Sequence, residues 1–482
     1  MATLKKNIIY NFAYEFLTFC FPLIVTPYIS RVLGPEGIGV YSFYYSVAQY
    51  FVLFAALGLK NYGTRAISGS IYRENRTELS KLFFEIFWMQ FCCALVVNVA
   101  YCAYILFFKT DRAISLVFYL YVVSSFFDIS WFFSGMEQFK LIFTRNIIIK
   151  AASTAAIFLF VKGRGDIAMY CVIMAGSILL SQLSLWLYLR RYVSFERILL
   201  ARAFRIHFIP NLKLFIPVIA VSIYKYMDKI MIGTMSSKME LGYYENVEKL
   251  VNIPVAFVTA LGTVMLSRIS YLYSRGDIRK SNAYMHTSIM FTWFISAGMI
   301  FGIICVLDVF VPLFFGPGYE KCIQLSYIML PTVFFLGISN VMRTQYLIPC
   351  KKDNVFILSV CIGAVVNFVL NSLLIGPLQS VGAAIGTLAA EFSVFLYQYV
   401  LCRREIGIQR ELYGGIGFGI AAGIMALLVS RLPMMMNSPL ITLVIRIAIG
   451  FVIYTVLAFG YVSVAMRDYR DLILGLLRKR SA

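Results

Sequence analysis

The sequence predicts an all-α integral membrane protein with about 14 transmembrane helices, arranged as two pseudo-symmetric six-helix lobes and two C-terminal helices. Hydrophobic residues make up 61% of the 482 residues, charged residues only 14%, and the mean hydropathy is +0.81. So much apolar surface requires the bilayer as the main solvent. The apolar runs are continuous, which favours helices over a β-barrel. Segments of the first half also recur in the second, which predicts two related lobes.

Short polar joints separate the apolar runs of spanning length. The runs predict spans at residues 8–30, 38–58, 82–108, 113–135, 147–161, 167–189, 214–233, 245–266, 285–307, 322–342, 355–375, 380–402, 414–430 and 440–466.

The distribution of basic residues predicts the orientation. Most of the 43 Lys and Arg residues lie in joints on the side of the N-terminus, and only eight lie in joints on the opposite side. Because Lys and Arg concentrate in cytoplasmic loops, both termini are expected in the cytoplasm. This orientation requires an even number of spans.

The internal repeat has an offset of roughly two hundred residues and predicts the domain organisation. The segment "GIGVYSFYYSVAQYF" at the second span resembles "ELGYYENVEKLVNIP" at the eighth, and "GMEQFKLIFTRN" after the fourth resembles "RTQYLIPCKKDN" after the tenth. The basic, partly amphipathic joint 190–213 is expected to lie on the cytoplasmic membrane surface. The predicted divisions are a first lobe with its cytoplasmic linker (1–208), a second lobe (209–408), and helices 13 and 14 with a basic cytoplasmic tail (409–482).

Several classes of function are disfavoured by the residues. The net charge of +20 is explained by cytoplasmic loops, and no nucleic-acid-binding motif accompanies it. His207 and His286 have no acid or nucleophile at motif spacing, so they are interpreted as interfacial histidines. No Walker loop or CxxC pair is present. We therefore expect no enzyme activity and no cofactor.

Ionisable residues at membrane depth are costly and indicate functional positions. In "YKYMDKIMIG" of the seventh span, Lys225, Asp228 and Lys229 put three charges within five residues. Lys225 and Asp228 can pair, and the whole stretch is expected to face a wet interior. Glu391 lies in the middle of the twelfth span with no local partner and is a second candidate.

Two other charged positions have a structural alternative. Glu245 and Lys249 stand four residues apart with the acid first, the favourable order for a helix ion pair, and Lys249 is equally a candidate for a cavity. Arg446 is close to the outer end of the last span and is expected to snorkel.

Polar side chains in the eleventh and twelfth spans complete the candidates. Asn367 and Asn371 lie on one face of the eleventh span, where asparagines commonly join helices together. Their amide oxygens, a hydroxyl from Thr387 and a carboxylate such as Asp228 would also suit a hard cation. The small residues Gly382 and Gly386 predict close packing of the twelfth span.

Several motifs together resemble a known family. The segments "PLIVTPYISRVLGPEGIGVYSFYYSVAQYF", "LGLKNYGTRAIS" and "DKIMIG" closely resemble those of Wzx-type oligosaccharide flippases. These form the polysaccharide transport branch of the multidrug/oligosaccharidyl-lipid/polysaccharide exporter superfamily. The resemblance covers nearly the whole chain, although the last two helices are not diagnostic.

The resemblance implies a substrate, a location and partners. It implies export of a polyprenyl-diphosphate-linked oligosaccharide from the inner to the outer leaflet of a bacterial plasma membrane. The implied mechanism is alternating access. The implied partners are membrane lipids and polysaccharide polymerase machinery. Diphosphate and sugars cannot cross hydrocarbon unaided. By analogy with the family, basic residues in a central cavity receive the head group. These are Arg31, Lys60 and Arg65 in the first lobe and Lys225, Lys229 and Lys249 in the second.

The resemblance also suggests an ion for resetting the carrier. Asp228, Asn367, Asn371 and Thr387 are similar to a sodium site of the lipid II flippase family, with asparagine where that family has a second acid. Protons are the alternative coupling ion, and Glu391 is a further candidate for ion coupling.

Alternatives remain at the level of sequence. A multidrug exporter would prefer an acidic or aromatic pocket, whereas these candidates are basic, and a lipid II flippase would work in nearly the same way. A membrane-embedded glycan polymerase or acyltransferase is disfavoured because catalytic clusters are absent and the outer joints are short. Arg31 itself has a structural interpretation as an anchor that pairs with Glu36 or a lipid phosphate.

Overall fold

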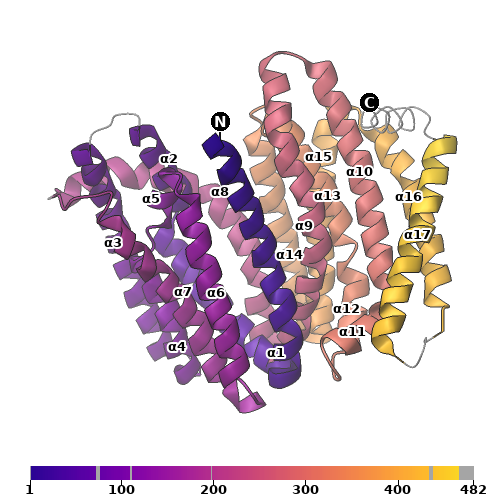
Figure 1. The fold of residues 1–482 in the computed structure, drawn as a ribbon, viewed down its shortest axis with the longest axis horizontal. Coiled ribbons are helices and arrows are strands. Elements are labelled where there is room, and N and C mark those ends of the chain that lie inside the picture. Colours follow the sequence, from indigo (N-terminus) through magenta and orange to yellow (C-terminus); the bar gives the residue numbers. More distant parts are fainter. Residues whose placement is uncertain (1, 72–75, 109–110, 197, 434–437, 466–482) are drawn as a thin grey trace. The chain divides into compact units, whose positions relative to one another are not determined.

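The chain is almost entirely helical (Figure 1). The computed structural model describes residues 2–71, 76–108, 111–196, 198–433 and 438–465. It divides into two compact units, Met1–Gly242 and Tyr243–Ala482. The three divisions expected from the sequence stay a prediction, and the predicted basic tail lies outside the described residues.

The first unit contains the elements α1 to α8 and two short 3₁₀ turns. Their bounds are α1 (Ala2–Ala56), α2 (Leu59–Ile71), α3 (Arg76–Phe107), α4 (Arg112–Val123), η1 (Ser124–Phe126), α5 (Ser130–Gly135), α6 (Phe139–Phe160), η2 (Arg164–Asp166), α7 (Ile167–Leu189) and α8 (Leu200–Met235).

The helix α9 begins in the first unit and continues into the second, which contains the remaining elements. Their bounds are α9 (Lys238–Ser274), α10 (Ile278–Ile304), α11 (Leu307–Phe314), α12 (Lys321–Met329), α13 (Thr332–Met342), the π-helical turn η3 (Arg343–Leu347), α14 (Asp353–Leu378), α15 (Ser380–Ile406), α16 (Gln409–Ser430) and α17 (Pro439–Ala465).

The predicted class of fold, an all-helical multi-pass membrane protein, is confirmed. Within the described residues, eleven helical segments are long and apolar enough to cross a membrane. One of them, Phe21–Ser70, covers two predicted spans, and a shorter apolar helix at Arg112–Phe126 falls on a third. The exact count of fourteen and the topology stay predictions.

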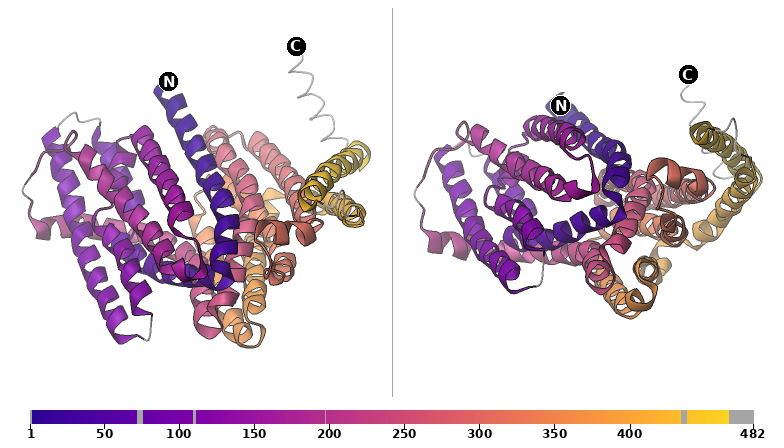
Figure 2. Two further views of the ribbon diagram at one scale, coloured as in Figure 1. Left: turned by 60° about the horizontal axis from the view of Figure 1, so that its bottom comes forward. Right: turned by 90° about the horizontal axis from the view of Figure 1, so that it is seen from below.

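The longest helix, α1, changes direction at Gly34 (Figure 2). Its backbone leaves helical geometry there with φ 71° and ψ 178°, and Pro35 follows. Positive φ is easily adopted by glycine, and proline removes a backbone donor. Pro22 and Pro27 lie inside the helix before this point, and the non-helical residue is Gly34.

A close backbone contact joins α1 to the start of α9 inside the first unit. A Cβ atom on Gly39 would lie 1.6 Å from the carbonyl oxygen of Lys238, and one on Gly242 would lie 1.8 Å from the carbonyl oxygen of Pro35. Gly39 and Gly242 occupy matching positions in the repeated segments of the sequence. Each repeat therefore supplies one glycine to a reciprocal contact that has no room for a side chain.

The fourth predicted span is interrupted, and Gln90 on α3 satisfies the backbone at the break. The chain passes from α4 through η1 to α5, and the Gln90 amide donates to the carbonyls of Ser125 and Asp128, both at 2.9 Å. The Gln90 side-chain oxygen accepts from the Trp131 indole at 3.0 Å. A break in a membrane helix needs such partners because lipid offers none.

Apolar clusters among the described residues stabilise the bundles. In the first unit, Phe83, Trp131 and Phe132 lie at the centre of a cluster shared by α2, α3 and α5. In the second unit, one cluster joins α10, α16 and α17, and another joins α10, η3 and α15. The helices α16 and α17 lie side by side at the end of the chain (Figure 1).

Small residues bring α14 and α15 together, as the sequence predicted. A Cβ atom on Gly382 would lie 2.3 Å from the Leu374 carbonyl oxygen, and one on Gly386 would lie 2.2 Å from the Asn371 side-chain oxygen. Close packing of the twelfth span is therefore confirmed.

The two joints compared in the sequence repeat have the same local geometry. Glu137 and Lys351 both have positive φ, 54° and 55°. Each stands two residues before a helix, α6 at Phe139 and α14 at Asp353. At the second joint, Lys352 donates to the Glu405 carboxylate at 2.7 Å, and this hydrogen bond raises the pKa of Lys352. The pair ties the start of α14 to the end of α15.

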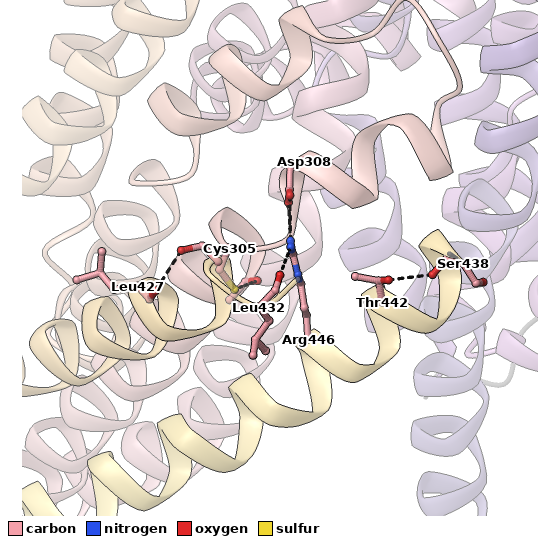
Figure 3. Close-up of polar contacts among 9 residues, drawn as sticks. Cys305, Asp308, Leu427, Leu432, Ser438, Thr442 and Arg446 are labelled. Carbon is pink, nitrogen blue, oxygen red and sulfur yellow. Dashed lines mark hydrogen bonds and ion pairs between the residues drawn. The ribbon is translucent and has the colours of Figure 1, made fainter. Parts of the chain in front are cut away.

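Arg446 is buried and held by two partners, and its snorkelling stays a prediction. Figure 3 shows its side chain between the Asp308 carboxylate and the Leu432 carbonyl. The two bonds to Asp308 are 2.9 and 3.0 Å long, the bond to Leu432 is 2.7 Å, and Arg446 is 6% exposed. The sequence could not reveal the partner because Asp308 is 138 residues away.

Candidate functional site

Three of the predicted head-group cations belong to α1 and α2 of the first unit. Arg31 lies one turn before the change of direction at Gly34 and is exposed. Lys60 and Arg65 lie on α2 and are also exposed. All three can therefore meet an anion without disturbing the core of their own unit.

The charged stretch of α8 is divided between an exposed and a buried face. Lys225 is exposed, and its Nζ lies 5.7 Å from the centre of the Tyr226 ring. Asp228 and Lys229 are buried, at 5% and 7% exposure. Asp228 lies near the phenol of Tyr50 and interacts with it electrostatically. The charges of this span thus lie among tyrosines of the first unit.

In the second unit, the predicted pairing of Glu245 and Lys249 is confirmed. The Lys249 Nζ lies 3.7 Å from a Glu245 carboxylate oxygen, one turn apart on α9. The Lys249 side chain remains 38% exposed. The pair does not exclude a role for Lys249 in binding an anion, because an exposed ion pair contributes little energy and is easily exchanged.

The polar groups of the eleventh and twelfth spans meet inside the second unit. The Asn371 side-chain nitrogen donates to the Asn367 side-chain oxygen at 3.2 Å, and both residues are fully buried. Asn371 packs on Gly386, and the next residue, Thr387, shares a hydrogen bond of 2.8 Å with the hydroxyl of Tyr244. These contacts place amide and hydroxyl oxygens on facing helices.

Glu391 lies one turn beyond Thr387 on α15 and is 5% exposed. A buried carboxyl group at membrane depth is costly, so Glu391 stays a candidate functional residue.

The candidate residues are divided between the two units. The first unit contains Arg31, Lys60, Arg65, Lys225, Lys229 and Asp228, and the second contains Lys249, Asn367, Asn371, Thr387 and Glu391. The structure brings Asn367 and Asn371 together with α15. The assembly of either full set stays a prediction.

Both histidines of the chain have a glutamate partner that sequence spacing did not reveal. His207 on α8 is 4% exposed; its Nε2 lies 3.2 Å from Glu85 on α3, and its Nδ1 lies 2.6 Å from the hydroxyl of Tyr62 on α2. In the second unit, the Nδ1 of His286 on α10 lies 2.8 Å from Glu411 on α16. The interpretation of both as interfacial histidines stays a prediction, and their acid partners lie far away in the sequence.

The two histidine–glutamate pairs follow the internal repeat with their partners exchanged. The acid lies on α3 and the histidine on α8 in the first unit, whereas the histidine lies on α10 and the acid on α16 in the second. The offsets of roughly two hundred residues between these positions could have suggested the pairs, but only after the repeat was aligned. The second half of the predicted linker, from Leu200 onward, is thus held by α8 packing on α2 and α3.

The Tyr62→Phe variant tests the first pair. It removes one hydrogen bond to His207, so we expect a loss of about 1 kcal/mol of stability. The midpoint of thermal unfolding in detergent measures this, with the exposed Tyr413→Phe as a control. An unchanged midpoint would mean that water replaces the phenol without cost.

Comparison with known proteins agrees with the predicted class. The model of the polysaccharide biosynthesis protein family matches residues 4–272. A provisionally assigned O-antigen transporter of Escherichia coli (strain K12) is 22% identical over 401 residues, which cover 81% of this chain and 94% of that protein. The lipid II flippase MurJ of Bacillus subtilis (strain 168) is 26% identical over 203 residues, which cover 39% of this chain and 37% of that protein.

A solved structure has the same fold. The lipid II flippase MurJ, in an inward closed conformation, superposes with a TM-score of 0.76 at 15% identity, covering 97% of this chain and 100% of that one. The fold is that of this flippase, and the relatives are named as transporters or flippases. This chain belongs to the polysaccharide biosynthesis protein family, which confirms the resemblance found in the sequence.

Proposed function

We propose that the protein moves polyprenyl-diphosphate-linked oligosaccharide units from the inner to the outer leaflet of the bacterial plasma membrane, for cell-surface polysaccharide biosynthesis. The observation that carries this proposal is the match of the polysaccharide biosynthesis family to more than half of the chain. The relative in E. coli, assigned to O-antigen transport, supports the class of substrate.

The charge of the candidate residues supports an anionic head group. Four of the candidate cations are exposed: Arg31, Lys60, Arg65 and Lys225. Arginine and lysine are the usual partners of phosphate. An inside-negative membrane potential also favours outward movement of negative charge, by about 2.3 kcal/mol per charge per 100 mV. Alternating access with a diphosphate cargo is therefore driven partly by the potential.

Deletion of the gene followed by analysis of lipid-linked sugars tests the proposed function. We expect the lipid-linked oligosaccharide to accumulate in the inner leaflet and surface polysaccharide to be lost. Unchanged glycans together with new drug sensitivity would identify a multidrug exporter instead. Arrest of peptidoglycan synthesis would identify a lipid II flippase, and accumulation of finished but unpolymerised units outside would point to a polymerase.

The Arg31→Lys variant tests the head-group role of Arg31. Guanidinium binds a diphosphate through two parallel hydrogen bonds, whereas lysine is a single point charge. We expect transport to fall about fivefold to tenfold, corresponding to a loss of about 1 kcal/mol or slightly more. Transport of labelled lipid in proteoliposomes measures this. If lysine supports full transport, Arg31 is an anchor at the membrane surface.

A coupling ion is the second part of the proposal. Sodium would be bound by the oxygens of Asp228, Asn367, Asn371 and Thr387, with protons at Glu391 as the alternative. In support, the Asn367 side-chain nitrogen is buried without a partner among the described residues, so rotating this amide would redirect its oxygen at the cost of the hydrogen bond from Asn371 alone. The buried Asp228 supplies the negative charge that the neutral amides lack.

The Asp228→Asn variant separates the two ions. We expect transport in proteoliposomes to lose its response to a sodium gradient, because the variant removes the single charge of the proposed site. The matched variant Glu391→Gln should leave the sodium response intact. A full sodium response in Asp228→Asn would refute the site, and a response to pH gradients alone would favour protons.

A further inference from the structure

A connected group of tyrosines lines part of the first unit at membrane depth. Tyr41 and Tyr45 on α1 stack with ring centres 5.6 Å apart, and Tyr45 stacks on Tyr121 of α4 at 5.5 Å. Tyr226 of α8 meets both Tyr45 and Tyr50 edge to face, at 6.5 and 6.2 Å. We call these five residues the tyrosine cluster.

The tyrosine cluster joins the charged stretch of α8. Lys225, a candidate for the head group, lies over the ring of Tyr226, and Asp228 lies near Tyr50. At the side of the cluster, Gln49 donates to the Tyr45 hydroxyl at 2.6 Å. A cation and an amide therefore border one surface of aromatic rings, and a buried acid lies near it.

The composition of this surface differs from that of the core in the same unit. The core around α3 and α5 is built mainly of phenylalanine and tryptophan, with rings that are fully buried. In the tyrosine cluster, Tyr41, Tyr45, Tyr50 and Tyr226 are only half-buried. Lipid cannot satisfy hydroxyl, amide and ammonium groups, so a half-buried surface of this kind is suited to a polar molecule.

A sugar ring is a molecule that fits such a surface. One face of a pyranose carries C–H groups, which pack on the electron-rich face of an aromatic ring. Its hydroxyl groups need hydrogen-bonding partners at the edge, and phenol and amide side chains provide them. Tyrosine offers both kinds of contact with little loss of side-chain freedom.

We propose that the tyrosine cluster is the subsite that binds the sugars of the cargo, next to a diphosphate held by Lys225. The inference rests on the proposed function and extends it to residues that select glycan over bare lipid. The order along the surface follows the cargo, in which the diphosphate directly precedes the first sugar. A cation followed by aromatic rings matches this sequence of groups.

Binding measurements with two probes test the subsite. The full-length protein in nanodiscs is titrated with polyprenyl diphosphate alone and with the polyprenyl-diphosphate-linked oligosaccharide extracted from the gene-deletion strain. We expect Tyr45→Ala and Tyr226→Ala to weaken binding of the oligosaccharide-linked probe about tenfold and that of the bare lipid less than twofold. Tyr45→Phe keeps the ring and should lose about threefold at most, through the hydroxyl alone.

Control variants distinguish the failures. Tyr413→Ala removes a 71% exposed tyrosine from α16 and should change neither affinity. Equal weakening of both probes by Tyr45→Ala, or no weakening of either, would overturn the subsite. If the wild-type protein shows no preference for the glycan-linked probe, the proposed function itself fails. Tighter binding of a cationic dye that is lost in Tyr45→Ala would assign the cluster to drugs.

Discussion

Replacing Gly39 or Gly242 by alanine is expected to lower transport more than tenfold and to lower stability by about 3 kcal/mol, the upper end of the usual cost of overpacking. A Cβ atom at either position would meet a carbonyl oxygen at 1.6 or 1.8 Å. Backbone cannot rotate away as a side chain can, so α1 and the start of α9 would have to separate. Transport in proteoliposomes and thermal unfolding of the purified protein measure the two effects.

A glycine elsewhere in the same unit provides the control. Gly176 lies inside α7 with nothing within 4 Å of the position of its Cβ. Alanine has the better helix propensity by about 1 kcal/mol, so Gly176→Ala should be neutral or stabilising. If Gly39→Ala behaves like Gly176→Ala, the close contact does not exist in the protein in the membrane. If stability falls but transport is kept, the contact stabilises one state without being required for the cycle.

The class of fold could be predicted from the sequence because its cause is local. Bilayer thickness sets the length of an apolar helix, and the joints between the runs are short and polar. The pairing of Glu245 with Lys249 and that of Asn367 with Asn371 could also be predicted, since both pairs lie one turn apart on one helix. Residues four apart on a helix face the same side whatever the fold.

Contacts between distant segments could not be predicted in this way. Glu85 is 122 residues from His207, and Asp308 is 138 residues from Arg446, and no rule of spacing connects either pair. The partners of His207 and Arg446 were missed for this reason. The internal repeat was the one long-range signal available. Its alignment matches Gly39 with Gly242, but it does not predict that the two segments are in contact.

Replacing Gln90 by leucine is expected to lower stability by about 2–4 kcal/mol, the cost of leaving two buried carbonyls unsatisfied. The Gln90 amide donates to the carbonyls of Ser125 and Asp128. These carbonyls lie at the interruption between η1 and α5, where the helix does not continue. Leucine fills nearly the same volume, so packing is largely kept and the missing hydrogen bonds dominate. The indole of Trp131 also loses its acceptor.

Asn98→Leu is the matched control on the same helix, because Asn98 is as deeply buried as Gln90 and bonds only within α3. Its nitrogen donates to the Ala94 carbonyl, one turn back, and its side-chain oxygen has no partner within the described residues. Removing such a group should be neutral or stabilising, within about 1 kcal/mol. Thermal unfolding of both variants in one detergent makes the comparison. Equal midpoints would mean that water or a rearranged backbone supplies hydrogen bonds to the carbonyls of Ser125 and Asp128. Gln90 would then have no particular role at the interruption of the fourth span.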